Sequence, residues 1–505
     1  MKLFSLQVRH VLILSLVITI SSTSFVSAER YAEKDAKFFE SFVQSWNALE
    51  HTITEASNYI VEFIQDIFHI SDQHTSKFNY DVTLVGFVNF ADGIGRHPIL
   101  FKECLEHHVK MNFASTRNIP AEIEDEQLGL PRLNPADKQD VGAIAILTDI
   151  LADKKFNIYK KVPNSLIKIA YTMFESTEIP CNWPAILNSK FDMAVVPDAF
   201  LCDVYKKCGV KIPIFVLPLP LVLHDFLKIK QRPIPHKKFV FGMTAGFWKR
   251  KNHMRVLEAF AAEFGNRKDV ILKLHGRFGQ KELINDLADK IKEYKLTNVE
   301  LIVKPYTWEE YVEFFKSLDC YVFLSMGEGF SITPREALAS GKPCILTNNT
   351  AHITICNTGA VRVVPSNILV PAFYDNHYDN HYSNCLGLSL TKNFLEMSDE
   401  DLLDSIDDIN LLLRSATVGY QFDCEMGDAR AAMRDVYEHY SDYVVKAKWG
   451  REWVKKYLHK NLCSQYVSLV KPKSVVLGTE NIIGDKFLMT NSKSLYEKYR
   501  YILGE

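Results

Sequence analysis

A strand, a glycine-bearing turn and a short helix follow one another in the second half of the chain, and this unit most constrains the fold. The run Cys320–Leu324 is apolar throughout, which is typical of a strand buried on both faces of a parallel sheet. For the helix we expect Thr333 as N-cap, Pro334 as first residue and Gly341 as terminator. Such a unit offers backbone N–H groups and a positive dipole end to an anion.

Two carboxylates lie in this unit, Glu328 in the turn and Glu336 in the first helical turn. Both are placed to accept hydrogen bonds from hydroxyls on the molecule that carries the anion. A phosphate combined with hydroxyls indicates a nucleotide sugar. A second interpretation stays open, because Thr333-x-x-Glu336 is also a capping box, in which Glu336 only holds the helix end.

Further apolar runs predict two parallel sheets with helices on both faces, because helical patterns separate several of the runs. The first group of predicted strands comprises 82–87, 142–147, 167–171 and 192–196. The second group comprises 239–243, 271–275, 299–303 and the runs that contain Cys320 and Cys344. We therefore expect an α/β protein.

A basic loop joins the first strand of the second group to a helix. It runs from Gly246 through Lys249, Arg250 and Lys251 to Asn252, which we expect to cap the helix. Three cations at a helix N-terminus oppose the helix dipole, and this arrangement is favourable where an anion binds. The alternative is a solvated basic loop without a ligand.

Two places in the first half are candidates for ligand binding. The loop after the first strand carries Gly93, Gly95 and Arg96, although a plain strand-to-helix turn would look the same. Glu175 follows the end of the strand 167–171, where ligands of parallel sheets gather. A solvated loop acid is the alternative for Glu175.

The N-terminus has the plan of a secretory signal peptide. Lys2 and Arg9 precede the apolar run Val11–Ile20, and small residues lead to an expected cleavage after Ala28. An uncleaved anchor is the alternative, although the run is short for a spanning helix. The helix expected over 32–70 is predicted to pack on the protein, and peripheral membrane contact is left open.

The ten cysteines show no tight framework and no CxxC pair, and a chain of 505 residues does not need disulfides to fold. This pattern indicates a reducing compartment and conflicts with the signal peptide. The net charge of −2 gives no overall attraction to nucleic acid, so we expect no nucleic-acid partner and a local anion site.

The segment from Gly327 to Pro343 resembles the signature of retaining GT-B glycosyltransferases of family four (glycosyl transferases group 1), of the bacterial type. The resemblance implies two Rossmann-like domains that face a cleft, with Gly93, Gly95, Arg96 and Glu175 on its acceptor side. In that family the glutamate matching Glu328 contacts the donor sugar, and the glutamate matching Glu336 contacts the ribose. Arg250 and Lys251 match the residues that grip the diphosphate. Many relatives have an arginine where this chain has Phe247, and Arg277 is a candidate substitute.

The resemblance therefore implies transfer of a sugar from a nucleotide-diphosphate sugar, commonly of uridine or guanosine, to an unspecified glycan, lipid or protein. It implies retention of configuration, no metal and no further cofactor. An inactive nucleotide- or glycan-binding protein, or a nucleotide-sugar epimerase or hydrolase, is the alternative. The predicted catalytic residues are Glu328, Lys251 and Arg250, and the donor-binding set adds Gly246, Arg277, Gly327, Gly329, Phe330, Ser331 and Glu336.

The expected domain boundaries follow from these features. Residues 1–28 form the signal peptide or anchor, 29–78 a helical extension and 79–225 the acceptor-side domain. Residues 226–440 form the nucleotide-sugar domain, and 441–505 form C-terminal helices and a tail. Helical patterns begin near residue 398, and the polar repeat at 375–382 is expected to be a loop rather than a metal site.

Overall fold

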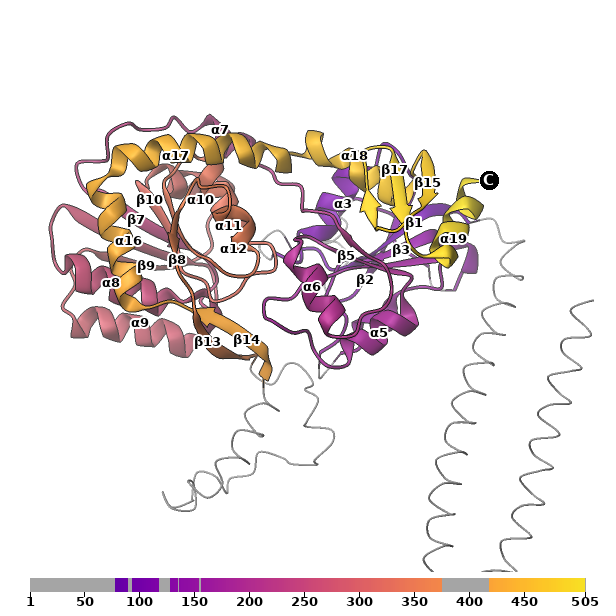
Figure 1. The fold of residues 1–505 in the computed structure, drawn as a ribbon, viewed down its shortest axis with the longest axis horizontal. Coiled ribbons are helices and arrows are strands. Elements are labelled where there is room, and N and C mark those ends of the chain that lie inside the picture. Colours follow the sequence, from indigo (N-terminus) through magenta and orange to yellow (C-terminus); the bar gives the residue numbers. More distant parts are fainter. Residues whose placement is uncertain are drawn as a thin grey trace, which may run out of the picture. The chain divides into compact units, whose positions relative to one another are not determined.

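The computed structural model describes residues 78–89, 93–117, 128–134, 136–153, 156–374 and 417–504 (Figure 1). The chain divides into two units, 1–77 and 78–505, and all described residues belong to the second unit. The predictions for the signal peptide, the helix over 32–70, the repeat at 375–382 and the helical pattern at 402–412 lie outside the described residues.

The first sheet has six parallel strands in the order β2-β1-β3-β4-β5-β6. These strands are β1 (Tyr80–Gly86), β2 (Met111–Ser115), β3 (Gly142–Leu147), β4 (Ile167–Tyr171), β5 (Met193–Val196) and β6 (Ile214–Val216). The connecting helices are α3 (His97–Leu105), α5 (Trp183–Lys190) and α6 (Phe200–Lys207), with short 3-10 turns at Lys138–Asp140 and Ile158–Lys161. The central strands are buried at nearly every position, as their apolar sequences predict.

The second sheet has the order β12-β11-β10-β7-β8-β9, again with all pairs parallel. Its strands are β7 (Phe239–Thr244), β8 (Val270–Gly276), β9 (Val299–Val303), β10 (Cys320–Phe323), β11 (Cys344–Thr347) and β12 (Arg362–Val364). Its helices are α7 (His224–Lys228), α8 (His253–Phe264), α9 (Lys281–Glu293), α10 (Trp308–Lys316), α11 (Ile332–Ala339) and α12 (His352–Cys356). In this doubly wound order the strand sequence reverses between β7 and β10, where such sheets bind ligands.

An antiparallel hairpin follows the second sheet. It pairs β13 (Ile368–Phe373) with β14 (Thr417–Asp423), so that Ile368 lies opposite Asp423. Its two strands are joined by residues 374–416, most of which lie outside the described part of the chain.

The C-terminal segment leads back to the first sheet. It comprises α16 (Met426–Glu438), α17 (Tyr440–Trp453), a 3-10 turn (Val454–Tyr457), α18 (His459–Val470), β15 (Ser474–Leu477), β16 (Ile482–Ile483), β17 (Phe487–Thr490) and α19 (Lys493–Leu503). Helix α16 packs on α8, α17 packs on α11, and α18 packs on α3 of the first sheet. The tail, for which the sequence gives no signal, forms the small sheet β15-β17-β16.

A disulfide joins α3 to α18 through Cys104 and Cys463, which are 359 residues apart. The expectation of a chain without disulfides is therefore wrong, because spacing along the sequence does not reveal a pairing over this distance. Cys320 and Cys344 are buried free thiols, as predicted. No helix among the described residues is long and apolar enough to cross a bilayer.

Candidate functional site

The basic loop after β7 and the glycine turn after β10 meet at the reversal point of the second sheet. The backbone N–H of Met326 donates to the carbonyl of Arg250 at 2.9 Å, which ties the two loops together. The sequence features that predict an anion site thus lie on adjacent loops at the carboxyl edge of one sheet.

The glutamate of the turn lies on the two cations of the basic loop. Lys251 Nζ donates to both carboxylate oxygens of Glu328, at 2.7 and 2.9 Å, and Arg250 donates to one of them at 3.2 Å. The Ser325 hydroxyl adds a third donor at 2.6 Å. All three predicted catalytic residues are therefore in mutual contact and largely buried.

The charges of this cluster depend on one another. Burial raises the pKa of Glu328, but Lys251 and Arg250 lower it more, so that the net pKa is about 2. Burial lowers the pKa of Lys251, as does the neighbouring Arg250, and Glu328 opposes that shift. Glu328 is consequently held as a carboxylate between two cations.

Arg250 also reaches the loop after β4 of the first sheet. Its guanidinium donates to Glu175 at 2.9 Å and to the carbonyl of Gly327. The glycines of the turn allow this approach, because a Cβ at Gly327 would lie 2.1 Å from the Glu175 carbonyl oxygen. A Cβ at Gly329 would lie 2.8 Å from the sulfur of Met173. Glu175 is therefore part of the cluster rather than a solvated loop acid.

The helix after the turn begins earlier than predicted. Helix α11 starts at Ile332, with Ser331 at the N-cap position in the left-handed region (φ 66°). The expectation of Thr333 as N-cap and Pro334 as first residue is wrong, because the Thr333 hydroxyl accepts from the Tyr321 hydroxyl at 2.7 Å instead of capping. Gly341 has φ 68° just after the helix, as its terminator role requires.

The second glutamate does not form a capping box. Glu336 is buried and accepts from the Tyr311 hydroxyl at 2.6 Å, and Arg96 lies 3.8 Å from its other oxygen. Burial raises the pKa of Glu336, against the opposing effects of Arg96 and Tyr311. Arg96, from the loop after β1, thus faces the glutamate that the resemblance assigns to the ribose.

Strained backbone is concentrated at these loops. Among the described residues, four non-glycine residues have positive φ, and three of them are Asn252, Ser331 and Thr350. The Thr350 hydroxyl accepts from the Glu328 backbone N–H at 2.8 Å, so this strained residue supports the turn directly. Backbone strain of this kind is often found at functional sites, where surrounding contacts maintain it.

Comparison with known proteins points to one family for part of the chain. Residues 225–366 match the family model for glycosyl transferases group 1. The matched region contains the second sheet and is named the group 1 domain after this similarity. The chain is also 24% identical over 226 residues to the alpha-1,3/1,6-mannosyltransferase ALG2 of Dictyostelium discoideum, a match covering 39% of this chain and 52% of that protein. The match spans about half the length of this relative.

Two solved structures share the arrangement of the group 1 domain and its companion sheet. One is HepE of Anabaena, crystallised with UDP and glucose, with a TM-score of 0.52 and 10% identity over 77% of this chain and 99% of that one. The other is sucrose-phosphate synthase of Thermosynechococcus elongatus, with a TM-score of 0.50 and 11% identity over 77% and 98% of the two chains. At these identities the likeness shows the fold, and the predicted GT-B architecture is confirmed.

Three further residues singled out from the sequence are Phe247, Arg277 and Gly246. They lie in or near the basic loop, but each has surroundings other than the charged cluster. Phe247 is buried against the ring of His253, with the ring centroids 4.7 Å apart, so it faces the interior of the domain. Arg277 follows β8 and lies 4.6 Å over the ring of Phe278. Gly246 lies close to the indole of Trp248, and the proposed substitution of Arg277 for the missing arginine stays a prediction.

Two further side chains, those of Arg335 and Asn252, have local roles in the packing of the site loops. Arg335 is buried within α11, 3.9 Å over the Phe330 ring, and it donates to the Ser331 carbonyl at 2.9 Å. Phe330 and Ser331 thus belong to the packing beneath the turn. Asn252 occupies the N-cap position of α8 but makes no side-chain cap, since its amide donates to Asp423 at 2.8 Å.

Four residues of the site were not predicted from the sequence, namely Ser325, Thr350, Tyr311 and Asp423. Ser325 and Thr350 follow the ends of β10 and β11, so their position after parallel strands could have marked them. Tyr311 lies on an ordinary amphipathic helix and carries no local signal.

Among the first-sheet candidates, Gly95 lies against the backbone of Asn89, whereas Gly93 is exposed and has no atom near its Cβ position.

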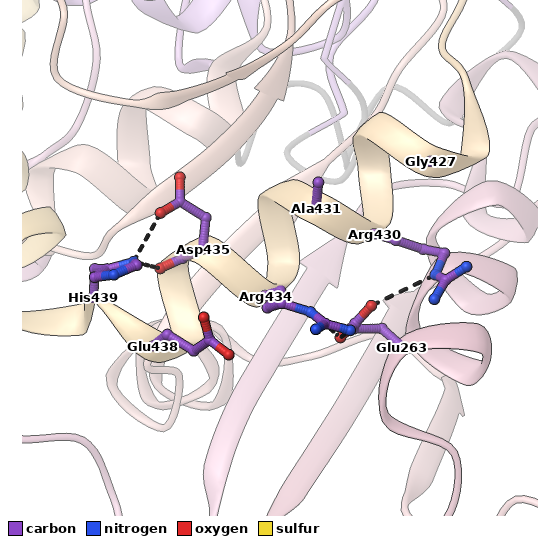
Figure 2. A pocket seen from close by; sticks show the side chains of 8 residues that line it. All are labelled: Glu263, Gly427, Arg430, Ala431, Arg434, Asp435, Glu438 and His439. Carbon is purple, nitrogen blue, oxygen red and sulfur yellow. Dashed lines mark hydrogen bonds and ion pairs between the residues drawn. The ribbon is translucent and has the colours of Figure 1, made fainter.

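A surface pocket of about 320 Å³ lies apart from this site (Figure 2). In it Glu263, near the far end of α8, lies between Arg430 and Arg434 of α16, with contacts of 3.5 and 2.6 Å. Along the helix axis Glu263 is roughly 15 Å from His253 at the helix start. The charges of the pocket are paired with one another, so we assign it no ligand. No cluster of three or more metal-ligating side chains occurs in the described ranges.

Proposed function

We propose that this protein is a glycosyltransferase that moves a hexosyl group from a nucleoside diphosphate sugar to an acceptor hydroxyl. The contact of Glu328 with both Lys251 and Arg250 carries this proposal. These residues combine a cation pair suited to a diphosphate with a carboxylate suited to sugar hydroxyls, at the ligand-binding edge of a group 1 domain. The UDP and glucose bound by HepE support a nucleotide-sugar donor, and the mannosyltransferase activity in the name of ALG2 supports transfer of a hexose.

The cations are placed to stabilise the leaving group. As the bond between the sugar and the diphosphate breaks, negative charge develops on the phosphate oxygens, and fixed cations and helix N–H groups lower this barrier. Lys251 and Arg250 supply the cations, and the N-terminus of α8 follows them directly. In this proposal they do the work that a metal ion does in other transferases, and no further cofactor takes part.

The carboxylates are placed to orient the donor. A carboxylate can accept about four hydrogen bonds. Glu328 accepts its hydrogen bonds from Lys251, Arg250 and Ser325. A diphosphate bound to the same cations would weaken the hydrogen bonds of Lys251 and Arg250 to Glu328. The Glu328 carboxylate could then accept hydrogen bonds from sugar hydroxyls. Glu336, held by Tyr311, is the proposed ribose contact. Retention of configuration is part of the proposal: the acceptor hydroxyl attacks the sugar carbon on the face from which the diphosphate leaves, and a departing phosphate oxygen takes the hydroxyl proton.

Release of nucleoside diphosphate from a panel of UDP- and GDP-sugars, with and without candidate acceptors, tests the proposal. We expect release in the wild type that depends on an acceptor, and strong loss in Glu328→Ala. Asp269→Asn is the control, because the half-exposed Asp269 side chain bonds to Arg267 and Tyr437 rather than to Glu328, Arg250 or Lys251. Binding without release would support an inert binding protein. Release without a glycosylated product would support a hydrolase.

Retention and the role of cations have their own tests. The anomeric configuration of the product, read by NMR, should match that of the donor. Activity should persist after treatment with EDTA, since Lys251 and Arg250 are proposed to neutralise the diphosphate. An inverted product or loss of turnover restored by a divalent cation would refute the corresponding part of the proposal.

We also propose that the chain enters the secretory route. The disulfide between Cys104 and Cys463 supports this, because such bonds persist in oxidising compartments. The signal-like residues 1–28 point in the same direction. Mass spectrometry of the purified protein should find an N-terminus at Glu29 and the Cys104–Cys463 linkage. An intact N-terminus together with reduced thiols would contradict the proposal.

A further inference from the structure

Strand β14 contacts the three loops that carry Glu175, Glu328 and the cation pair Arg250 and Lys251. Its Phe422 N–H donates to the carbonyl of Met326, in the turn after β10, at 2.8 Å. Its Tyr420 exchanges hydrogen bonds with Thr177, just after Glu175, at 2.9 and 3.0 Å. Its last residue, Asp423, reaches the loop after β7. The hairpin therefore fixes these loops relative to one another.

Asp423 holds the start of α8 at two points. One carboxylate oxygen accepts from the Asn252 amide at 2.8 Å, and the other accepts from the Arg255 guanidinium at 2.7 Å. The first oxygen also accepts from the Cys424 backbone N–H at 2.8 Å. The side chain is 15% exposed, so solvent screens these bonds only in part.

The contact with Asn252 bears on the two cations. Asn252 follows Lys251 and has φ 62°, a left-handed conformation that turns the chain from the basic loop into α8. Asparagine tolerates this conformation better than most residues, but it still needs support from its surroundings. The first turn of α8 contains no acid of its own, and the Asp423 carboxylate beside it supplies the negative charge that a helix N-terminus favours.

We propose that Asp423 is a positioning residue for the donor diphosphate, acting through Asn252 to hold Arg250 and Lys251 in place. This inference rests on the proposed function of those two cations. Asp423 need not touch the donor itself, since its bonds fix the turn that presents the cations. A residue of the hairpin, outside the matched 225–366 region, thereby controls the affinity of the group 1 domain for its ligand.

A double-mutant cycle on the full chain tests the proposal, with UDP as the probe and calorimetry as the measurement. Asp423→Ala and Asn252→Ala should each raise the Kd of UDP by about tenfold, and the double variant should bind no worse than the weaker single variant. Asp423→Asn should lie between wild type and Asp423→Ala, because an amide oxygen can still accept from Asn252 but cannot pair with Arg255. Asp269→Ala, which removes an ion-paired acid at the other end of the domain, is the control and should leave the Kd unchanged.

A second measurement needs no nucleotide. Acetylation of Lys251 by acetic anhydride, followed by peptide mass spectrometry, should be faster in Asp423→Ala than in wild type, while acetylation of the buried Lys342 should not change. If wild type binds neither UDP nor GDP, the proposed function fails, and the acetylation rates alone decide the role of Asp423. Unchanged Lys251 acetylation in Asp423→Ala, or additive effects in the cycle, would overturn the proposal.

Discussion

Arg250 and Glu175 form an ion pair of 2.9 Å that joins the loop after β7 of the second sheet to the loop after β4 of the first. The same guanidinium contacts Glu328, 3.2 Å away. A single arginine therefore links the two sheets at the point where the proposed donor binds. A substitution in this cluster should therefore affect both ligand binding and the contact between the two sheets.

Replacing Lys251 by alanine should reduce turnover by about 100-fold, because one fixed cation at the developing phosphate charge is lost. The free energy of UDP binding should fall by more than the free energy of unfolding, since Arg250 and Ser325 still contact Glu328 in the folded variant. Steady-state kinetics, calorimetry with UDP and urea unfolding measure the three quantities. Lys290→Ala is the control, because Lys290 is paired with Glu293 on the exposed face of α9. Equal UDP affinity in Lys251→Ala and wild type would remove the phosphate role.

Glu328→Gln should change how stability depends on pH. The pKa of Glu328 is lowered from 4.5 to about 2, so its carboxylate stabilises the folded state above pH 4.5, and this contribution is lost as the pH falls from 4.5 towards 2. The loss amounts to about 3 kcal/mol at most in wild type and should be missing in the variant. Urea unfolding at pH 6 and pH 3 compares the two proteins. A parallel decline in both would show that Glu328 has no such role.

Gly327→Ala should destabilise the turn by roughly 1–3 kcal/mol, as expected for forced overpacking. The added Cβ would lie 2.1 Å from the Glu175 carbonyl oxygen, so the two loops must separate and the Arg250–Glu175 contact should weaken. Gly427→Ala is the matched control. Gly427 lies in α16 with open space around its Cβ position, and alanine there should be neutral or stabilising by up to about 1 kcal/mol. Thermal unfolding and UDP affinity report the difference, and equal values for the two variants would contradict it.

Reduction of the disulfide should lower the free energy of unfolding by about 2–4 kcal/mol, because a cross-link between Cys104 and Cys463 restricts the unfolded chain. The double variant Cys104→Ser/Cys463→Ser should match the reduced wild type and should not respond to dithiothreitol. Cys202→Ser, which changes a free half-buried thiol, should retain the response. Urea unfolding with and without reductant makes the comparison. A wild type indifferent to reductant would show that the bond is absent in solution.

Most strands of both sheets could be predicted from the sequence, because buried parallel strands are uniformly apolar and are bounded by glycines and helical patterns. Strands β2, β6 and β12 were not predicted, since β6 and β12 have only three residues each and β2 contains polar residues. The cluster of Glu328, Arg250 and Lys251 could also be predicted, since all three follow strands of one sheet at its reversal point. The start of α11 could not be predicted from local signals. The Tyr321 hydroxyl takes the Thr333 side chain that would have capped the helix, and this tertiary contact overrides the local preference.

The contacts that local reasoning missed join residues far apart in the chain. Asp423 is 171 residues from Asn252, and Cys463 is 359 residues from Cys104. No periodicity or spacing rule connects such partners. The role of β14 became visible only once its hydrogen bonds to three loops were known.

The bond between α3 and α18 also makes the polypeptide a covalent ring with two tails. The whole second sheet lies within that ring, because its strands fall between residues 104 and 463. A protease that nicked any single exposed loop inside the ring would leave both fragments attached to each other. Under oxidising conditions the protein should therefore migrate as one species after such a cut, and it should fall into two pieces only when a thiol is added.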